Sequence, residues 1–338
     1  MALDGAAFSP KEFGLAIQAE TATLGTAKTD GMTRVNVDSV EMPSFNLTQV
    51  MDARSGSAGR VADGDDVFID QKGVTKEISF SGVLDTAVAA LLIQNCIAKD
   101  NSSNIVSIAH DYAPPELQTG DTSSLTIADT ITIAVLNPST GSNHNMILPG
   151  CVITSLTISG DMGDESGRLK FSATARSGYI AAFNQAAPTI SASYGTTFYS
   201  LATLSSGDAK KIAGCDDPVV QSFSLAIENP AEFVGQNDAN GNPDAIVRAV
   251  PEISVNLDAT VKYDANTGTL MNTMNTGGNA AFYMGTHATI GDSSTTFAFE
   301  SANARITSLS YNEANAMMID VSTKAVATSS GNLFQIHY

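Results

Sequence analysis

The stretch Glu-Ile-Ser-Val-Asn-Leu-Asp-Ala-Thr-Val, residues 252–261, alternates strictly between polar and apolar side chains. Successive side chains of an extended strand point to opposite faces, so this pattern predicts a strand with one buried face. Similar alternation recurs at residues 222–228, 125–135 and 169–176, and Ser, Thr, Val and Ile are frequent throughout. Such residues suit a pleated, half-buried surface. The sequence therefore predicts a mainly β protein.

Helical spacing is confined to two segments. Residues 85–98 can begin at a capping Asp85 or Thr86 and place several apolar side chains on one side. A shorter segment follows Asn266, with Leu270, Met271 and Met274 at helical spacing. We expect a helix or two packed against sheet.

Three short strings occur twice, in the same order. They are SFNL at 44–47 and SFSL at 222–225, EIS at 77–79 and 252–254, and ITSL at 153–156 and 306–309. Ordered self-similarity is typical of a duplicated unit. It predicts two tandem domains, residues 1–185 and 186–338. The first would carry an N-terminal arm and an inserted hairpin near 105–145.

The charge of the chain excludes one class of partner. The 338 residues include 35 Asp and Glu against 17 Lys and Arg, a formal net charge of −18. A protein that grips nucleic-acid phosphates needs clustered Lys and Arg, which are missing here. The hydrophobic content of 43% argues against wholesale disorder.

The chain carries no pattern of a secretory signal and no apolar run of membrane-spanning length. Cys96, Cys151 and Cys215 are odd in number and far apart. We expect them to be buried thiols in a reducing compartment rather than disulfides or metal ligands.

No familiar catalytic motif occurs, and the four histidines are isolated, so the sequence predicts no enzyme, cofactor or metal centre. Asp238, Asn240, Asn242 and Asp244 resemble the start of a calcium loop. Pro243 stands at the sixth position, where a calcium loop needs Gly, so a turn held by side-chain hydrogen bonds is the favoured interpretation. The acids at 63, 65, 66 and 70 allow the same two interpretations.

The N-terminal part of the chain carries a set of ordered short motifs. Phe13-Gly14-Leu15-Ala16 is followed by Glu20-Thr21 and then by Leu24-Gly25-Thr26. After a long Gly-rich loop that contains arginine come the strand Lys76–Phe80 and a predicted helix. Leu148–Ile158 then precedes a Gly/Asp turn and a last strand. Over residues 11–180 this order resembles the tail tube proteins of long-tailed bacteriophages, and the second half matches through the internal repeat.

The resemblance implies a virion structural protein made of two tandem tail-tube-like β-sandwich or barrel domains, each with a short flanking helix and a long loop. Such subunits form rings that stack into the hollow tail tube. A duplicated chain implies a homotrimer, a pseudo-hexameric ring. Its partners would be further copies and other phage tail proteins, and DNA would pass through the lumen at genome ejection without specific binding. The resemblance also implies assembly in the host cytoplasm, a final location in the virion tail and no membrane anchoring.

Two alternatives stay open at this point. One is a capsid decoration or other virion protein, and the other is a calcium-binding β adhesin module. A loop of about 25 residues with both charge signs is the candidate contact between stacked rings, because loops of that length are usually functional or disordered. Its candidate residues are Arg54, Arg60, Asp63, Asp65, Asp66 and Asp70.

Overall fold

The structure is a computed structural model that describes most of the 338 residues. The described residues are 9–20, 24–43, 48–51, 67–70, 75–97, 104–109, 117–118, 130–138, 144–192, 194–204, 210–235, 238, 241–249, 252–290, 292, 294–313, 316–328 and 331–338. We refer to residues 1–185 as the first half and to residues 186–338 as the second half.

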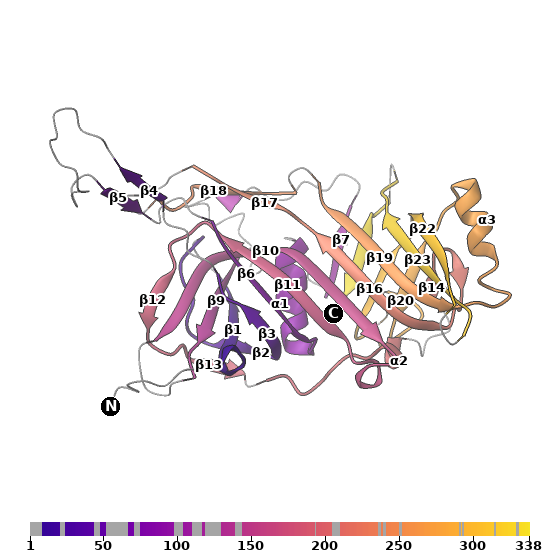
Figure 1. The fold of residues 1–338 in the computed structure, drawn as a ribbon, viewed down its shortest axis with the longest axis horizontal. Helices are drawn as coiled ribbons and strands as arrows, with labels where there is room; N and C mark the ends of the chain where they lie inside the picture. Colours follow the sequence, from indigo (N-terminus) through magenta and orange to yellow (C-terminus); the bar gives the residue numbers. More distant parts are fainter. Residues whose placement is uncertain are drawn as a thin grey trace.

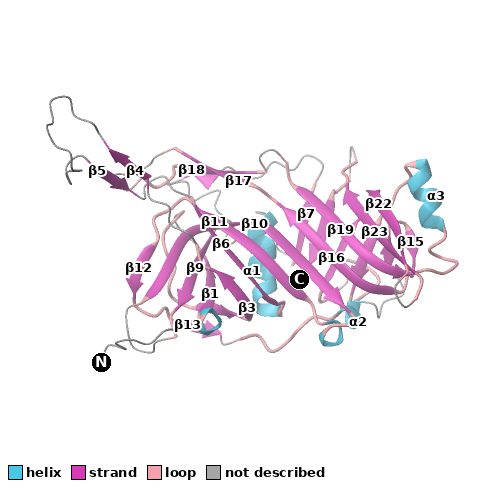
Figure 2. Ribbon diagram, viewed as in Figure 1, coloured by secondary structure: helices cyan, strands magenta, loops and turns pink. Residues whose placement is uncertain are grey.

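The protein is mainly β, as the sequence predicts (Figure 2). Eight strands of its largest sheet form one continuous antiparallel ladder, which we call the front ladder, in the order β3-β6-β11-β10-β16-β19-β23-β22. Their bounds are β3 Val37–Glu41, β6 Lys76–Val83, β11 Lys170–Ser177, β10 Asn145–Asp161, β16 Val220–Glu228, β19 Ser254–Lys262, β23 Met318–Ala325 and β22 Ala304–Asn312. The first four strands come from the first half and the last four from the second half.

Shorter ladders pack behind the front ladder. Behind the first half they run β13-β2-β1-β9-β10, with β12 also on β10, and behind the second half β15-β14-β20-β21-β24-β7. Their bounds are β13 Ile190–Ala192, β2 Met32–Val35, β1 Gly14–Ala19, β9 Ile131–Leu136, β12 Ala182–Gln185, β15 Cys215–Asp216, β14 Lys211–Ile212, β20 Phe282–Gly285, β21 Ala298–Ser301, β24 Phe334–His337 and β7 Ile105–Ile108.

Two hairpins lie outside these layers. The pair β4 Thr48–Met51 and β5 Val67–Asp70 forms one, and the pair β17 Ala231–Val234 and β18 Ala245–Arg248 forms the other. The two-residue strand β8, Leu117–Gln118, adds to β18. Figure 1 shows β17 and β18 above the first half and β4 and β5 beyond its far end.

Both predicted helices are present. Helix α1 spans Thr86–Ile97, and the carboxylate Oδ1 of Asp85 accepts the backbone N–H groups of Ala87 and Val88 at its start, at 2.9 and 3.0 Å. Helix α3 spans Thr269–Thr276. The remaining helical elements are α2 Leu201–Leu204 and the 3-10 turns η1 Pro10–Glu12 and η3 Glu165–Gly167. Helix α1 is packed between the layers, whereas α3 lies at the outer end of the second half (Figure 1).

Strand β10 passes from the back layer to the front ladder at Gly150. This residue has a φ of +61°, and a side chain there would collide with the ring of Tyr179, so glycine is required. The buried carboxylate of Glu20 accepts the N–H of Gly150 at 2.8 Å and of Gly25 at 3.0 Å. It also accepts the hydroxyls of Thr130 and Thr132. Glu20 therefore holds the bend that carries β10 into the front ladder.

A pH dependence follows from this site. Burial raises the pKa of Glu20 above its usual 4.5, against the opposing hydrogen bonds from Gly150 and the two threonines. The carboxyl group of Glu20 therefore keeps its proton up to a higher pH in the folded state than in the unfolded chain. We expect the free energy of unfolding to fall as pH rises from about 4.5 through the raised pKa, by at most about 1.4 kcal/mol per pH unit. Urea denaturation across pH 4–8 measures it. Glu20→Gln removes this component of the slope, and an identical slope in that variant would contradict the assignment.

The two halves of the front ladder match in strand order, register and irregularities. Strands β3, β6, β11 and β10 pair in the same succession as β16, β19, β23 and β22. The ladder β10–β11 has a bulge at Thr154, and β22–β23 has one at Thr307. The hydroxyl of each threonine donates to a carbonyl of the adjacent strand, at 3.3 and 3.2 Å. The β3–β6 and β16–β19 ladders are also both bulged, between Val37 and Ser39 and between Val220 and Ser222.

These registers define which residues are equivalent in the two halves. The backbone N–H of Leu84 donates to Leu169 O at 2.9 Å, and that of Tyr263 donates to Met317 O at 3.0 Å. The next residue is in each case an Asp, Asp85 or Asp264, whose carboxylate accepts the N–H groups two and three residues later. The likeness of the two halves therefore extends to single hydrogen bonds.

Of the two repeated strings that the structure describes in both halves, one occupies equivalent positions. The ITSL strings coincide at the two bulges. Phe80 pairs with Ala173 and Ala259 with Val321, which makes residues 77–79 equivalent to 256–258 rather than to the EIS string at 252–254. The SFNL string lies outside the described residues. Outside ITSL, the likeness of the two halves is mainly one of register, with isolated identities such as Asp85 and Asp264.

Strands cross the predicted boundary between the halves in both directions. Strand β13 of the second half pairs in parallel with β2, and β7 of the first half pairs with β24. One hydrophobic core continues through both halves. In the stretch predicted as an inserted hairpin, β7 and β9 lie in different sheets and do not pair with each other. The three cysteines are free and buried, as expected.

Candidate assembly interface

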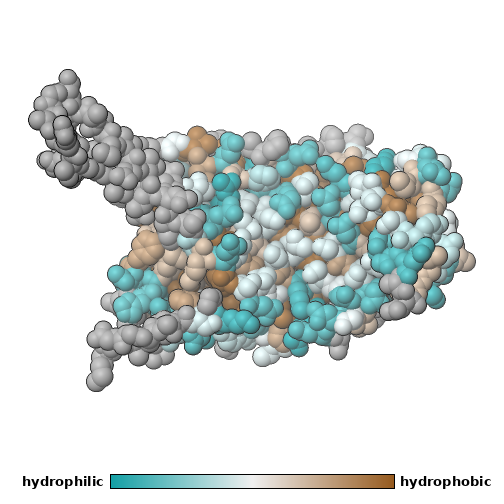
Figure 3. Space-filling model, in the orientation of Figure 1, coloured by the Kyte–Doolittle hydropathy of each residue, from teal (hydrophilic) through white to brown (hydrophobic). Residues whose placement is uncertain are grey.

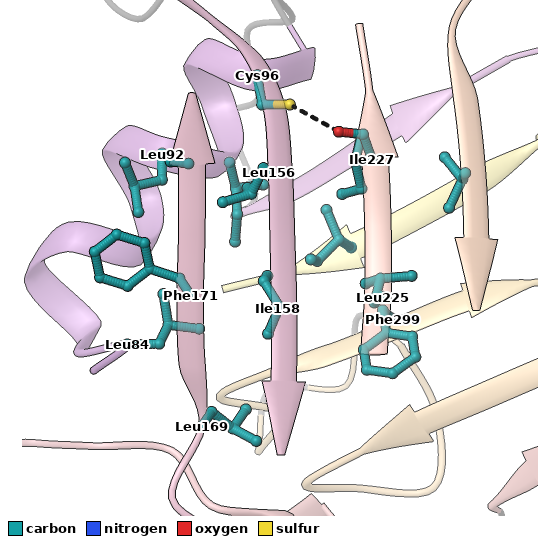
Figure 4. Close-up of a cluster of buried hydrophobic side chains, with 14 of the residues drawn as sticks. Leu84, Leu92, Cys96, Leu156, Ile158, Leu169, Phe171, Leu225, Ile227 and Phe299 are labelled. Atoms are coloured by element: carbon teal, nitrogen blue, oxygen red, sulfur yellow. Dashed lines mark hydrogen bonds between the residues drawn. The ribbon is translucent and has the colours of Figure 1, made fainter. Parts of the chain in front are cut away.

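The two halves meet where β10 pairs with β16. The register runs from Ser155 opposite Glu228 to Asp161 opposite Ser222 without a break. On the inner face, Leu156 pairs with Ile227 and Ile158 with Leu225, and all four side chains are fully buried (Figure 4). The junction between the halves is therefore a complete cross-strand interface with its own apolar core.

The outer face of the front ladder is rich in Ser and Thr. In Figure 3 its centre appears mostly white, the colour of intermediate hydropathy, with teal and brown residues among it. Some of these side chains bond across neighbouring strands. These pairs are Ser39 with Ser81 at 2.8 Å, Ser79 with Thr174 at 3.0 Å, Ser155 with Glu228 at 2.7 Å and Thr260 with Asp320 at 2.7 Å. The ladder thus presents one continuous polar surface across both halves.

The hairpin β17–β18 fastens the second half onto the first. The guanidinium of Arg248 is 2% exposed and donates to Asn95 O at 3.1 Å, Cys96 O at 2.8 Å and Ile153 O at 2.7 Å. The side-chain amide of Asn229 also donates to Cys96 O, at 2.7 Å. Carbonyl groups at a helix C-terminus lack partners within the helix and favour a cation. Residues of the second half therefore complete the last turn of α1.

The two ends of the front ladder are open. Within the described part of the chain, β3 pairs only with β6 and β22 only with β23. Strand β22 is the equivalent of β10, and β3 is the equivalent of β16. The two open edges therefore correspond to the two strands, β10 and β16, that pair with each other inside the chain. An open edge presents unpaired N–H and C=O groups that can pair with another chain.

The β22 end carries large apolar side chains that are exposed. Tyr263, Tyr311 and Met317 are 44%, 49% and 46% exposed, and the two tyrosine rings are 5.9 Å apart. Their equivalents in the first half are Leu84, Ile158 and Leu169, all completely buried (Figure 4). The first-half residues are covered because β16 and the segment before it pack beside them, as the bond from Leu169 N to Tyr199 O shows. Nothing in the described chain covers the β22 end in this way.

The β3 end carries a matching feature. Met42, just after β3, is 42% exposed, whereas its equivalent Leu225 is completely buried. Leu225 pairs with Ile158 in the internal junction, and Ile158 is the equivalent of Tyr311. If β22 met β3 as β10 meets β16, Tyr311 would lie opposite Met42. Two of the exposed large apolar residues would then cover each other.

The candidate contact residues from the sequence fall mostly outside this description. Asp70 is the last residue of β5 and pairs with Thr48 of β4. Arg54, Arg60, Asp63, Asp65 and Asp66 lie outside the described residues. The assignment of this loop to contacts between rings stays a prediction.

The possible calcium loop contains a turn. Asp238 accepts hydrogen bonds from the backbone N–H of Asn242 at 3.2 Å and from its side-chain amide at 2.9 Å. No three His, Cys, Asp or Glu residues of the described ranges cluster as metal ligands would. The turn is also closed by the backbone N–H of Gly241, which donates to Asp238 O at 3.0 Å.

Sequence reasoning missed the residues that define the interface. Arg248 stands alone between apolar residues and has no local pattern that would predict burial. Tyr311 has a usable signal: the apolar spacing of three between Ile306 and Leu309 matches that of Ile153 and Leu156, and in both strands this spacing accompanies the bulge. That shared irregularity makes β22 the equivalent of β10 in register.

No known family model matches the chain, and no curated protein sequence matches it. Among the described helices, none combines the length and the apolar character needed to cross a bilayer.

Proposed function

We propose that the protein is a self-assembling structural subunit whose copies join edge to edge, β22 of one copy to β3 of the next. The observation that carries the proposal is the pairing of β10 with β16, because these strands are the equivalents of β22 and β3 and already form this contact inside one chain. Contact between two different patches is heterologous, and it produces a closed ring when the rotation between copies closes. The two halves would then be tandem copies of one domain.

The proposed ring is a homotrimer with six similar domain positions, and stacked rings form the tail tube of a long-tailed bacteriophage. The support is the polar outer face of the front ladder, which would run without interruption from copy to copy. Three of the cations on this hydroxyl-rich face, Lys170, Arg176 and Lys324, are paired with the acids Asp164, Glu77 and Glu252, which leaves little to hold phosphates. Each copy adds a formal charge of −18 to the ring. Such a channel lets DNA pass during genome ejection without specific binding.

The register of the proposed contact can be tested with one designed disulfide. In the variant Met42→Cys/Tyr311→Cys, we expect oxidation to link neighbouring copies and to yield covalent dimers and trimers on a non-reducing gel. The native thiols do not interfere because all three are buried. Facing residues of an antiparallel pair have Cα atoms about 4.5–5.5 Å apart, within the range that a disulfide spans.

The matched control is Glu41→Cys/Tyr311→Cys, which places the first cysteine on the opposite face of the strand and should link poorly. Electron microscopy of the linked trimer then distinguishes tubes from isolated rings. Isolated rings would favour the capsid decoration alternative. A chain that stays monomeric at high concentration and forms no 42–311 link would contradict the proposal.

A further inference from the structure

The end of β10 and the turn after it are covered by a short helix of the second half, α2 (Figure 1). A Cβ atom at Gly160 or Gly167 would lie 3.5 or 3.2 Å from the Cβ of Leu201, the first residue of α2. The backbone N–H of Leu169, at the far side of the turn, donates to Tyr199 O at 2.9 Å. The internal junction therefore has two parts, the β10–β16 ladder and α2 packed on the turn beside it.

The first half has a short helical element at the same place in the order of strands. In the second half α2 precedes the back-layer pair β14–β15, which leads into β16. In the first half η1 precedes the back-layer pair β1–β2, which leads into β3. Leu201 and Phe223 of β16 both lie within 3.5 Å of the Cβ position of Gly160. Lys11 of η1 likewise lines a hollow with Val37 of β3, so η1 lies beside β3 as α2 lies beside β16.

In the proposed ring, η1 would meet the residues that follow β22 of the preceding copy. Glu313 comes two residues after Tyr311, so it takes the place of Gly160. Met317 takes the place of Leu169. Glu313 and Met317 are exposed, whereas Gly160 and Leu169 are buried. Because η1 has the place of α2, it is the segment of a second copy that would cover these two residues.

The chemistry of this contact differs between the two junctions. Inside the chain α2 places the apolar Leu201 against a glycine. At the open edge η1 carries Lys11 and the glycine position carries Glu313, and both side chains are exposed. The neighbouring Glu12 is engaged within η1, where its carboxylate accepts the backbone N–H of Ser9 at 2.6 Å. A basic η1 and an acidic turn are complementary, which favours a second copy of this chain as the partner.

We propose that η1 of each copy packs on the residues that follow β22 in the preceding copy, where Lys11 forms an ion pair with Glu313. This inference rests on the proposed edge-to-edge assembly and adds a second contact to the same junction. Charged pairs across an interface act mainly on the choice of partner and on register. The pair would therefore favour β3, rather than another open edge, as the partner of β22.

Charge reversal tests this pair. We expect Lys11→Glu and Glu313→Lys each to weaken the association between copies by about tenfold, because like charges then face each other. The double variant Lys11→Glu/Glu313→Lys restores the opposite charges and should associate to within about threefold of wild type. Analytical ultracentrifugation over a concentration series measures the association.

Two control variants make the same changes of charge elsewhere. Lys28→Glu lies in the back layer, where the backbone N–H of Lys28 donates to Thr132 Oγ1 at 2.9 Å. Glu232→Lys lies on the exposed side of β17. Both controls should associate like wild type. If they weakened association as much as the reversals at Lys11 and Glu313, net charge would explain the effect and the ion pair would be wrong.

The outcomes separate the two proposals. If the 42–311 disulfide forms but the single reversals associate like wild type, or the double variant does not recover, the ion pair is wrong and the edge contact stands. If the wild-type chain neither associates nor forms that disulfide, both proposals fail.

Discussion

Replacing Arg248 by methionine is expected to lower the free energy of unfolding by about 3 kcal/mol, although methionine fills a similar volume. Three carbonyl groups, of Asn95, Cys96 and Ile153, lose a charged donor inside the protein. A hydrogen bond from a charged donor contributes about 1.5–3 kcal/mol, and Cys96 O keeps the bond from the side-chain amide of Asn229. The losses fall on the contact between the halves, so the second half should detach from α1 before the ladders unfold. Chemical denaturation followed by circular dichroism measures the total.

Two further variants make this prediction specific. Arg248→Lys keeps the charge but has a single nitrogen to share among three carbonyls, so its loss should be intermediate. Arg168→Met removes an arginine whose side chain is 43% exposed and should change the free energy of unfolding by at most about 0.5 kcal/mol. Equal effects of Arg248→Met and Arg168→Met would show that the three carbonyl contacts do not stabilise the junction.

The strand segments were predictable because one face of the front ladder is buried and the other is polar. Strand β19 covers Ser254–Lys262, close to the predicted 252–261. Alternation was less reliable at β9, where all six residues are buried because core packs on both of its faces. Side-chain alternation reports burial on one face and does not identify which strands are neighbours.

Strand partners were not predictable, because pairing depends on contacts far apart in sequence. The side chain of Gln335 on β24 bonds Ser107 on β7, 228 residues away. No local pattern near residue 107 indicates that partner. The exposed tyrosines were equally hidden, since an apolar residue on a strand ordinarily predicts a core position. Within the described residues, Tyr311 has a paired strand on one side, β23, whereas Ile158 has one on each side, β11 and β16.

The largest effect on assembly is expected from Tyr311→Asp. Tyr311 occupies the position of Ile158, which is fully buried against Leu225 in the internal junction. In the proposed ring it faces Met42, so the variant would bury a carboxylate without a partner and lose the apolar contact. A cost of about 3 kcal/mol per junction corresponds to a more than hundredfold weaker contact. A closed ring carries that change at every junction, and ring formation should become undetectable by electron microscopy and ultracentrifugation.

The monomer itself should tolerate the substitution, because Tyr311 is about half exposed there and an aspartate can stay hydrated. Unchanged circular dichroism and thermal unfolding of the monomer would establish that only association is lost. Met162→Asp is the matched control: Met162 is 43% exposed, in the turn after β10 and on neither open edge. If Tyr311→Asp formed rings as abundant as those of Met162→Asp, β22 would not be part of the contact between copies. Loss of ring formation in Tyr311→Asp alone would support a contact between copies in which Tyr311 takes the place that Ile158 has in the internal junction.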